Sequence, residues 1–435
     1  MDTARALFKG KKITVLGLGL LGKGLGDTAF LAECGASLTV TDLKSTKELA
    51  SSIAVLKKYK NIRYVLGKHE MSDFENCDMV IKAQGVPLDS EYIAHAEAHG
   101  IPVRMDDELF VSLAPKGVKI IGVTGTRGKT TTASLIFHIL KKAGKRVYLG
   151  GNIRGVATLA FLKKVRAGDY VVLELSSWQL QGFISQKISP TVSVFTNFMP
   201  DHMNYYKNDL DRYFADKAGI FAYQKSGDTL VVGEGLVKKI PRSYKGTLAP
   251  ASSALVPKSW KLPLAGEHNR ENIAFAIATC RALKIPLVKI RAGVASFKAV
   301  SGRLELVKTL RGVKIYNDNN STTPEATIAA LMSFPKKQTV LIMGGADKKL
   351  PIDALLETAR AYAHTVILLA GTGSDRITEA DFYRASSLKE GLTSAYRSAE
   401  KGDVVLFSPG FASFGMFVNE YDRGDQFVKL VRLLK

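Results

Sequence analysis

The 435-residue sequence predicts an α/β protein of three domains, and three observations support this. Short β-branched runs alternate with amphipathic segments along the chain, as in parallel strands joined by helices. Most of the runs end in glycine-rich or polar loops, where α/β sheets bind ligands. The chain is also longer than one hydrophobic core usually covers. We expect a Rossmann-like domain at residues 1–115, a central P-loop domain with a mostly parallel sheet at 116–298, and a Rossmann-like α/β domain at 299–435.

The composition narrows the class of protein. Apolar residues make up 46% and charged residues 23%, which is ordinary for a globular chain. The net charge of +21 favours anionic ligands, but the basic residues are scattered rather than gathered in a run with aromatics, so we expect no nucleic-acid partner. Three distant cysteines argue against disulfides or a zinc site. Without a signal-type leader or a run of about 18 apolar residues, we expect a cytoplasmic protein with no membrane insertion.

The first domain carries a glycine fingerprint. Residues 12–18 are expected to form a strand that enters Gly17-x-Gly19-x-x-Gly22, and Asp42 follows the next strand at 37–41. This is the Rossmann pattern, whose geometry holds a diphosphate, so a dinucleotide and a nucleotide-linked substrate both remain open. Further strands are expected at 79–82, which ends in a turn at Gly85, and at 101–104.

The central domain begins with a phosphate-binding loop. A strand at 118–121 leads into Gly125-Thr-Arg-Gly-Lys129-Thr130, and a helix is expected to follow at 133–140. The glycines let backbone N–H groups converge on an anion, Lys129 adds positive charge, and the Thr130 hydroxyl can reach a magnesium ion. Val123 stands where the longer P-loop pattern has glycine. A nucleoside triphosphate is the expected ligand, and a plain glycine turn is the alternative.

Three further strands are expected in this domain, and one of them ends on a carboxylate. Glu174 closes an apolar run beside the phosphate loop, which suits a magnesium ligand. Capping of the next helix above Ser176-Ser177 is the alternative, and the two are compatible. The strands are expected at 145–149, 169–175 and 191–196.

The rest of the central domain offers less specific candidates. His202 lies on the loop after a strand, where a ligand or catalytic role competes with that of a plain loop histidine. Lys217 lies in an amphipathic helix and, by sequence chemistry alone, is a helix-surface cation. Asn269 and Asn272 share a helix face, where they could contact an adenine edge, and capping by Asn269 is the alternative.

The third domain repeats the pattern of strands that end in polar loops. The first strand ends in Asn317-Asp318, and the last in the segment 408–414. We therefore expect a third α/β sheet with its binding edge at the strand C-termini. The strands are expected at 313–316, 339–343, 365–370 and 403–407.

Taken together, these loops resemble those of the Mur ligases, the ATP-dependent amino-acid ligases of peptidoglycan precursor synthesis, over essentially the full chain. The motifs include Gly151-Asn152-Ile153, Asp201-His202-Met203, Arg303 and those above. The likeness is strongest to the D-glutamate-adding members, because of the N-terminal fingerprint, the Asn317-Asp318 loop, Gly344-Gly345-x-x-Lys348 and Ser408-Pro409-x-x-Ala412-Ser413-Phe414.

The resemblance implies a function and a set of residue roles. The activity would be ATP-dependent addition of D-glutamate to UDP-N-acetylmuramoyl-L-alanine through an acyl phosphate, by an enzyme we expect to be a monomer. Lys129, His202 and Lys217 would be catalytic. Two magnesium ions would be held by Thr130, Glu174, His202 and a carbamylated Lys217. ATP would be bound by Gly125, Thr126, Arg127, Gly128, Lys129, Thr130, Thr131, Asn269, Asn272, Arg303 and Asp318. The two other substrates would be bound by Gly17, Gly19, Leu20, Asp42, Gly85, Asn152, Ser176, Thr322, Lys348, Ser413 and Phe414.

The sequence departs from the family pattern at a few positions and leaves other functions to weigh. Arg127 and Asn204 stand where asparagine and aspartate are usual, Leu21 replaces threonine, Asn320 replaces lysine, and Glu420 replaces an aromatic residue. The alternatives are a Mur-like or folylpolyglutamate-type ligase with another acceptor, an NAD-dependent oxidoreductase that uses the N-terminal fingerprint, and a basic nucleic-acid-dependent ATPase. An oxidoreductase function would not explain the second phosphate loop, at residues 125–130.

Overall fold

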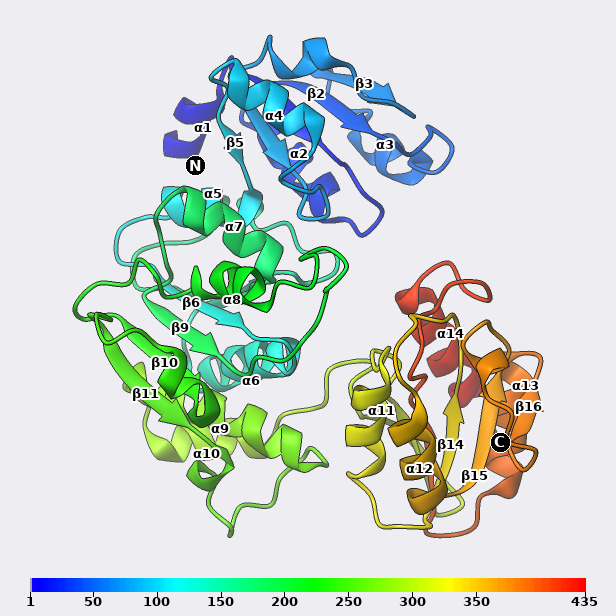
Figure 1. Cartoon of the computed structure of the whole chain (residues 1–435). Coiled ribbons are helices and arrows are strands. Elements are labelled where there is room, and N and C mark those ends of the chain that lie inside the picture. Colours follow the sequence, from blue (N-terminus) through cyan, green and yellow to red (C-terminus); the bar gives the residue numbers. More distant parts are fainter. Residues whose placement is uncertain (1) are drawn as a thin grey trace. The chain divides into compact units, whose positions relative to one another are not determined.

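The computed structural model describes residues 2–435, and side chains from residue 4 onward (Figure 1). The chain forms two compact units, which are described separately. One comprises Met1–Leu255 with Ala274–Gly293, and the other Val256–Ile273 with Val294–Lys435. The first unit contains two β-sheets and the second contains one, and the predicted α/β class is confirmed.

The N-terminal sheet of the first unit has five parallel strands in the order β3-β2-β1-β4-β5. The order reverses at β1, so the loops after β1 and β4 meet at a switch point, where ligands bind in such sheets. There a Cβ on Gly17 would lie 3.0 Å from the Cβ of Ala83. The elements are α1 Asp2–Phe8, β1 Lys12–Leu16, α2 Lys23–Glu33, β2 Ser37–Asp42, α3 Ala50–Leu56, β3 Ile62–Leu66, η1 Met71–Phe74, β4 Met79–Lys82, α4 Glu91–Ala98, β5 Val103–Arg104 and α5 Asp106–Leu113.

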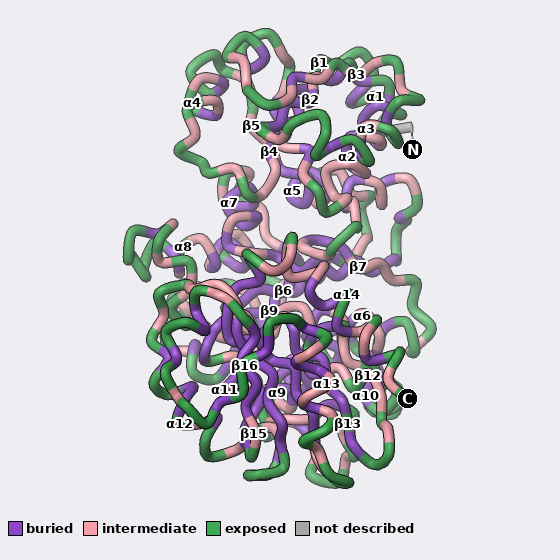
Figure 2. The backbone as a smooth tube through the Cα atoms, turned by 90° about the vertical axis from the view of Figure 1, so that its right-hand side faces the viewer, coloured by how far each residue is buried: buried purple, intermediate pink, exposed green. Residues whose placement is uncertain are grey.

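The second sheet of this unit is also parallel, in the order β11-β10-β9-β6-β8-β7. Its central strands β6 and β8 are almost wholly buried, as continuous apolar runs require, and Figure 2 shows the burial around β6 and β9. The elements are β6 Lys119–Thr124, α6 Lys129–Lys142, β7 Val147–Gly151, η2 Leu159–Lys163, β8 Tyr170–Glu174, α7 Ser177–Ser185, β9 Val192–Phe195, α8 Leu210–Ala218, β10 Thr229–Gly233, η3 Glu234–Lys239, β11 Thr247–Ala251 and η4 Ser253–Leu255. Two further helices, α9 Glu267–Ala282 and α10 Leu287–Ala295, each have residues in both units.

The sheet of the second unit has the order β12-β13-β17-β14-β15-β16, and β12 alone runs antiparallel to its neighbour. Alternate residues of β14 face opposite sides: Leu341 packs with α11 and α12, and Val340 with α13 and α14 (Figure 1). The elements are β12 Glu305–Leu310, β13 Val313–Asn317, α11 Pro324–Leu331, β14 Thr339–Met343, α12 Asp353–Tyr362, β15 Ala363–Leu369, η5 Ser374–Arg376, β16 Tyr383–Ala385, α13 Leu388–Ser398, β17 Val404–Phe407 and α14 Glu420–Leu433.

The predicted strands are confirmed in all three sheets, with ends shifted by up to three residues. Helix α9 begins at Glu267, so Asn269 lies in its first turn. Among the described residues, no helix is both long and apolar enough to cross a membrane.

Candidate functional site

The phosphate-type loop lies between β6 and α6 and is hydrogen-bonded to the end of β9. The Thr126 N–H donates to the Asn197 carbonyl at 2.9 Å, and the Arg127 N–H donates to Asn197 Oδ1 at 2.8 Å. The hydroxyl of Thr196 donates to the Arg127 carbonyl at 2.7 Å. Gly128, with φ 82°, then leads into α6, whose N-terminus adds partial positive charge. The loop is therefore fixed before any ligand binds.

Two lysine amines converge on the same loop. Lys129 Nζ donates to the carbonyls of Gly125 and Thr126 at 3.1 Å each, and Lys217 Nζ donates to the Gly125 carbonyl at 2.9 Å. The interpretation of Lys217 as a helix-surface cation is wrong, because the residue is only 2% exposed. It lies on the inward face of α8, where burial, followed by the charge of Lys129, lowers its pKa well below the ordinary value.

Arg127 is paired with a carboxylate on the loop that carries His202. Its Nη1 lies 3.0 Å from Asp201 Oδ2, and His202 Nε2 lies 3.9 Å from the same oxygen. Burial would raise the pKa of Asp201, but Arg127 and His202 together hold it below the ordinary value. Burial also lowers the pKa of His202, which favours the neutral imidazole that binds metals. Arg127 thus joins the phosphate loop to the His202 loop.

Glu174 offers a carboxylate oxygen suited to a cation. Its Oε1 accepts a long hydrogen bond of 3.4 Å from Asn152 Nδ2, whereas Oε2 is buried and has no hydrogen-bond partner among the described residues. The capping alternative is not what the structure shows, because Ser176 caps α7 in a capping box with Gln179. A buried carboxylate oxygen without a partner is costly unless a cation fills the position, so the site fits magnesium.

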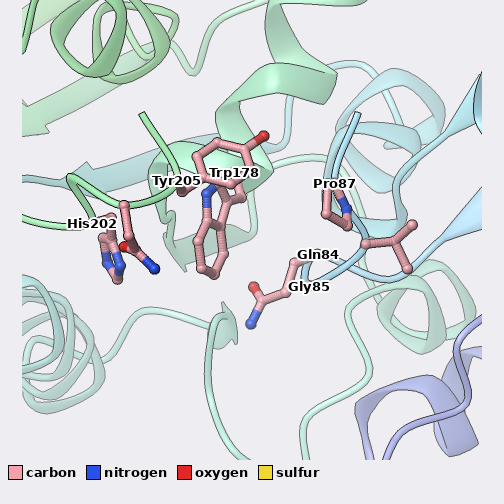
Figure 3. A pocket seen from close by; sticks show the side chains of 8 residues that line it. Gln84, Gly85, Pro87, Trp178, His202 and Tyr205 are labelled. Atoms are coloured by element: carbon pink, nitrogen blue, oxygen red, sulfur yellow. The ribbon is translucent and has the colours of Figure 1, made fainter. Parts of the chain in front are cut away.

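A pocket of about 290 Å³ lies close to this carboxylate. Figure 3 shows that the segment with Gln84, Gly85 and Pro87 faces Trp178, His202 and Tyr205, and the pocket is completed by Val86 and Asn204. The ring centroids of Trp178 and His202 lie 5.0 Å apart. Gln84 Nε2 donates to Asn152 Oδ1 at 2.8 Å, so one chain of polar contacts runs from the pocket through Asn152 to Glu174.

The glycine loop of the N-terminal fingerprint is hydrogen-bonded to the fingerprint's own carboxylate, Asp42. The carboxylate of Asp42 accepts from the Gly19 N–H at 3.0 Å and from the Lys44 N–H at 2.9 Å, and it is buried. Leu20 between the glycines is 48% exposed, which leaves it accessible to a ligand. The loop is therefore shaped by a carboxylate inside it, with its tip open to solvent.

In the second unit, Asp318 follows β13 and is buried at the centre of a polar cluster. It accepts from the Leu304 N–H at 3.0 Å and from the hydroxyls of Ser321 and Ser408 at 2.5 and 2.9 Å. Burial raises its pKa to about 6, even though each of these contacts, and nearby Arg303, acts in the opposite direction.

Two predicted amides and four predicted substrate residues also gather in the second unit. Asn272 Nδ2 donates to Asn269 Oδ1 at 3.1 Å, and Asn269 itself donates to the Ala265 carbonyl rather than capping the helix. Lys348 Nζ donates to the Thr322 hydroxyl at 2.9 Å. The bridge between residues 346 and 412 brings the loop of Lys348 beside the predicted substrate residues Ser413 and Phe414.

Sequence reasoning missed four residues that the geometry places in or around the site. Gln84 and Trp178 line the pocket, and Thr196 and Asn197 hold the phosphate loop. Trp178 had a sequence signal, because it is one of only two tryptophans and lies in the first turn of the helix after the Glu174 strand. The other three look like ordinary polar residues at strand ends.

Comparison with known proteins identifies the family. The fold and the loop define a nucleotide-binding α/β protein, and three family models match in order. They are the MurD-like N-terminal domain at 11–105, the Mur ligase middle domain at 123–247 and the Mur ligase glutamate ligase domain at 302–411. The chain belongs to the Mur ligase family.

Curated relatives and solved structures agree with this assignment. The UDP-N-acetylmuramoylalanine–D-glutamate ligase of Borreliella burgdorferi is 35% identical, covering 98% of each chain, and that of Clostridium kluyveri is 36% identical over 99% of this chain and 98% of the relative. The alanine ligase MurC of Thermotoga maritima has a TM-score of 0.61 at 19% identity, over 97% of this chain and 99% of its own. MurF of the same organism, solved with ADP, has a TM-score of 0.60 at 17% identity, over 99% and 98%.

Proposed function

We propose that this protein uses ATP to join D-glutamate to the carboxyl group of UDP-N-acetylmuramoyl-L-alanine in peptidoglycan precursor synthesis. The observation that carries the proposal is the fixed phosphate loop and its two lysines, beside a strand that ends in Glu174 with an unpartnered oxygen. The full-length likeness to D-glutamate ligases supports the choice of substrates.

The reaction has two steps, and the protein serves them mainly by positioning and charge. A carboxylate oxygen of the first substrate attacks the γ-phosphorus, and ADP leaves. The amine of D-glutamate then attacks the acyl carbon, loses a proton, and phosphate leaves with the pair of electrons from the broken C–O bond. The loop amides and Lys129 stabilise the negative charge that spreads over the phosphoryl oxygens.

Thr130 and Glu174 would hold one magnesium ion, and His202 with Lys217 a second. A magnesium ion supplies charge neutralisation at the phosphoryl oxygens. Lys217 would serve as a carbamate, since a lowered pKa favours the neutral amine, which is the form that adds carbon dioxide. The carbamate would carry the negative charge that a metal ligand needs.

The remaining predicted residues are assigned by substrate. The fingerprint loop, Gly85 and Asn152 would face the UDP-linked substrate, and the Lys348–Thr322 pair with Ser413 would face D-glutamate. Asn269, Asn272, Arg303 and Asp318 would contact the nucleoside and phosphates of ATP. We expect a monomeric cytoplasmic enzyme.

The test is phosphate release from ATP with UDP-N-acetylmuramoyl-L-alanine and a panel of D-glutamate, L-glutamate, L-lysine, L-alanine and meso-diaminopimelate. Release only with D-glutamate supports the proposal, and the Lys129→Ala variant should lose most of it while remaining folded. If phosphate is released only with an amino acid other than D-glutamate, the proposed acceptor is wrong but the ligase reaction stands. No release with any of them, together with nicotinamide binding at the fingerprint, would favour the oxidoreductase.

A further inference from the structure

Away from the site described above, three side chains of the N-terminal sheet region gather in a metal-like arrangement. His95 lies in the last turn of α4, His99 caps the end of that helix, and Glu75 follows η1. One nitrogen or oxygen atom from each lies within 4.8 Å of the other two. His95 and His99 are four residues apart, so they share one face of the helix.

The distances match the edges of a small coordination polyhedron. His95 Nε2 lies 3.0 Å from Glu75 Oε2, and His99 Nε2 lies 3.7 Å from the same oxygen. With metal–nitrogen and metal–oxygen bonds of about 2.0–2.2 Å, a tetrahedral site places its ligand atoms about 3.3–3.5 Å apart. The two distances to Glu75 therefore lie within a few tenths of an ångström of these values, and the third, between the two imidazoles, is at most 4.8 Å.

The hydrogen bonding of His99 fixes which of its nitrogens faces the cluster. Nδ1 lies 2.9 Å from the His95 carbonyl, and a carbonyl only accepts, so Nδ1 carries the proton. In that tautomer Nε2 presents a lone pair toward Glu75 Oε2, which lies 3.7 Å away, so a cation between the two atoms would be bound by both. A hydrogen bond from the other imidazole nitrogen to a carbonyl commonly orients a metal-bound histidine.

The surroundings also favour a cation. The cluster lies at the C-terminal end of α4, where the helix dipole is negative. The side chains of His95, Glu75 and His99 are 27%, 36% and 46% exposed, so an ion can enter from solvent without local unfolding.

We propose that Glu75, His95 and His99 form a binding site for a divalent transition ion of the zinc class, separate from the magnesium positions of the ligase reaction. Two imidazoles and one carboxylate suit Zn²⁺ better than Mg²⁺, which prefers oxygen ligands alone. The ion pins the end of α4 to the segment after η1. Since α4 follows the Gly85–Pro87 loop that lines the pocket, the ion also steadies that loop.

The experiment is calorimetric titration of the untagged full-length protein with ZnCl₂ in millimolar MgCl₂, together with CoCl₂ absorption spectra and melting curves. The excess magnesium occupies sites that prefer oxygen ligands. We expect Zn²⁺ to bind at this site and raise the melting temperature, and Co²⁺ to give the visible bands of a low-coordinate site. His99→Ala and Glu75→Gln should each weaken Zn²⁺ binding by about tenfold or more.

Two variants make the result specific. His364 forms a histidine–carboxylate pair of 3.1 Å with Asp403 in the second unit, and the described residues offer no third ligand there, so His364→Ala should bind Zn²⁺ normally. His202→Ala removes the histidine of the ligase site and should also retain binding. His99→Ala should melt like the wild type in EDTA, which shows that it is folded. Equal Zn²⁺ affinity in the wild type and in both cluster variants would overturn the proposal, as would loss of binding only in His202→Ala.

Discussion

The hydrogen bonds from Thr196 and Asn197 that hold the phosphate loop predict that one added methyl group at Gly125 strongly weakens ATP binding. This glycine has φ 145°, and a Cβ placed on it would lie 2.0 Å from Thr196 Oγ1 and 3.1 Å from the Asn197 N–H nitrogen. Ordinary contact is about 3.5 Å. The hydroxyl would have to retreat by more than 1 Å, roughly, and would lose its 2.7 Å bond to the Arg127 carbonyl. The loop would then separate from the end of β9.

The magnitude of the Gly125→Ala effect follows from these contacts. An L-residue at this φ costs about 1–3 kcal/mol, and the overlap costs a further 1–3 kcal/mol, roughly. If two loop hydrogen bonds worth about 1 kcal/mol each are lost from the binding-competent form, ATP affinity falls about thirtyfold. Gly144→Ala is the matched control, because its φ is also positive, at 79°, but the added methyl would meet nothing within 4 Å.

The assay is ATP binding by calorimetry beside melting curves for both variants. Gly144→Ala should lower stability by about 1 kcal/mol through backbone strain and leave ATP affinity unchanged. Gly125→Ala should lower both. Unchanged ATP affinity in a folded Gly125→Ala protein would refute the reasoning that the β9 end holds the loop.

Three further predictions test other parts of the site. Glu174→Gln keeps the shape but removes an anionic ligand, so we expect turnover to fall about a hundredfold or more and the magnesium concentration for half-maximal rate to rise, with the melting temperature preserved; normal magnesium dependence would contradict this. Arg127→Gln and Asp201→Asn should each lower the free energy of unfolding by about 1 kcal/mol or less, because the pair is partly exposed. A double-mutant cycle should show that the two losses are coupled, and strictly additive losses would show that the two side chains do not interact. Burial lowers the pKa of Lys82 to about 8, so the folded state releases this proton more readily than the unfolded state, and stability should rise as the pH goes from about 8 to 10.5. Lys82→Met should flatten that rise and stabilise the protein at pH 7 by up to about 3 kcal/mol, and an unchanged pH profile of the melting temperature would exclude the effect.

The fold was largely predictable from the sequence because strand and helix patterns are local. Most parallel strands of the three sheets were predicted as apolar runs, whereas β3, β10, β11 and β16 were not, and the glycine turns predicted as binding loops do follow β1 and β6. The same locality explains why a glutamate at the end of β8 could be proposed as a magnesium ligand. Its unpartnered oxygen became visible only in the structure.

Lys217 and Arg127 show which contacts could not be predicted from the sequence. The sequence pattern alone predicted Lys217 to be a surface residue, and only tertiary packing turns it toward the loop after β6. Arg127 stands where asparagine is usual in the family, and the structure places it 3.0 Å from Asp201, seventy-four residues along the chain. Contacts of this kind depend on how distant segments meet, which helix and strand periodicity does not encode.

The most direct test of the central claim follows the oxygen atoms of the substrate carboxylate. UDP-N-acetylmuramoyl-L-alanine labelled with ¹⁸O at its alanyl carboxylate is incubated with ATP, Mg²⁺, D-glutamate and the protein, and the phosphate is analysed by mass. If a carboxylate oxygen attacks the γ-phosphorus and then leaves with it, one labelled oxygen appears in the phosphate and the other stays in the new amide. Phosphate without label, formed alongside the amide product, would contradict the acyl-phosphate mechanism.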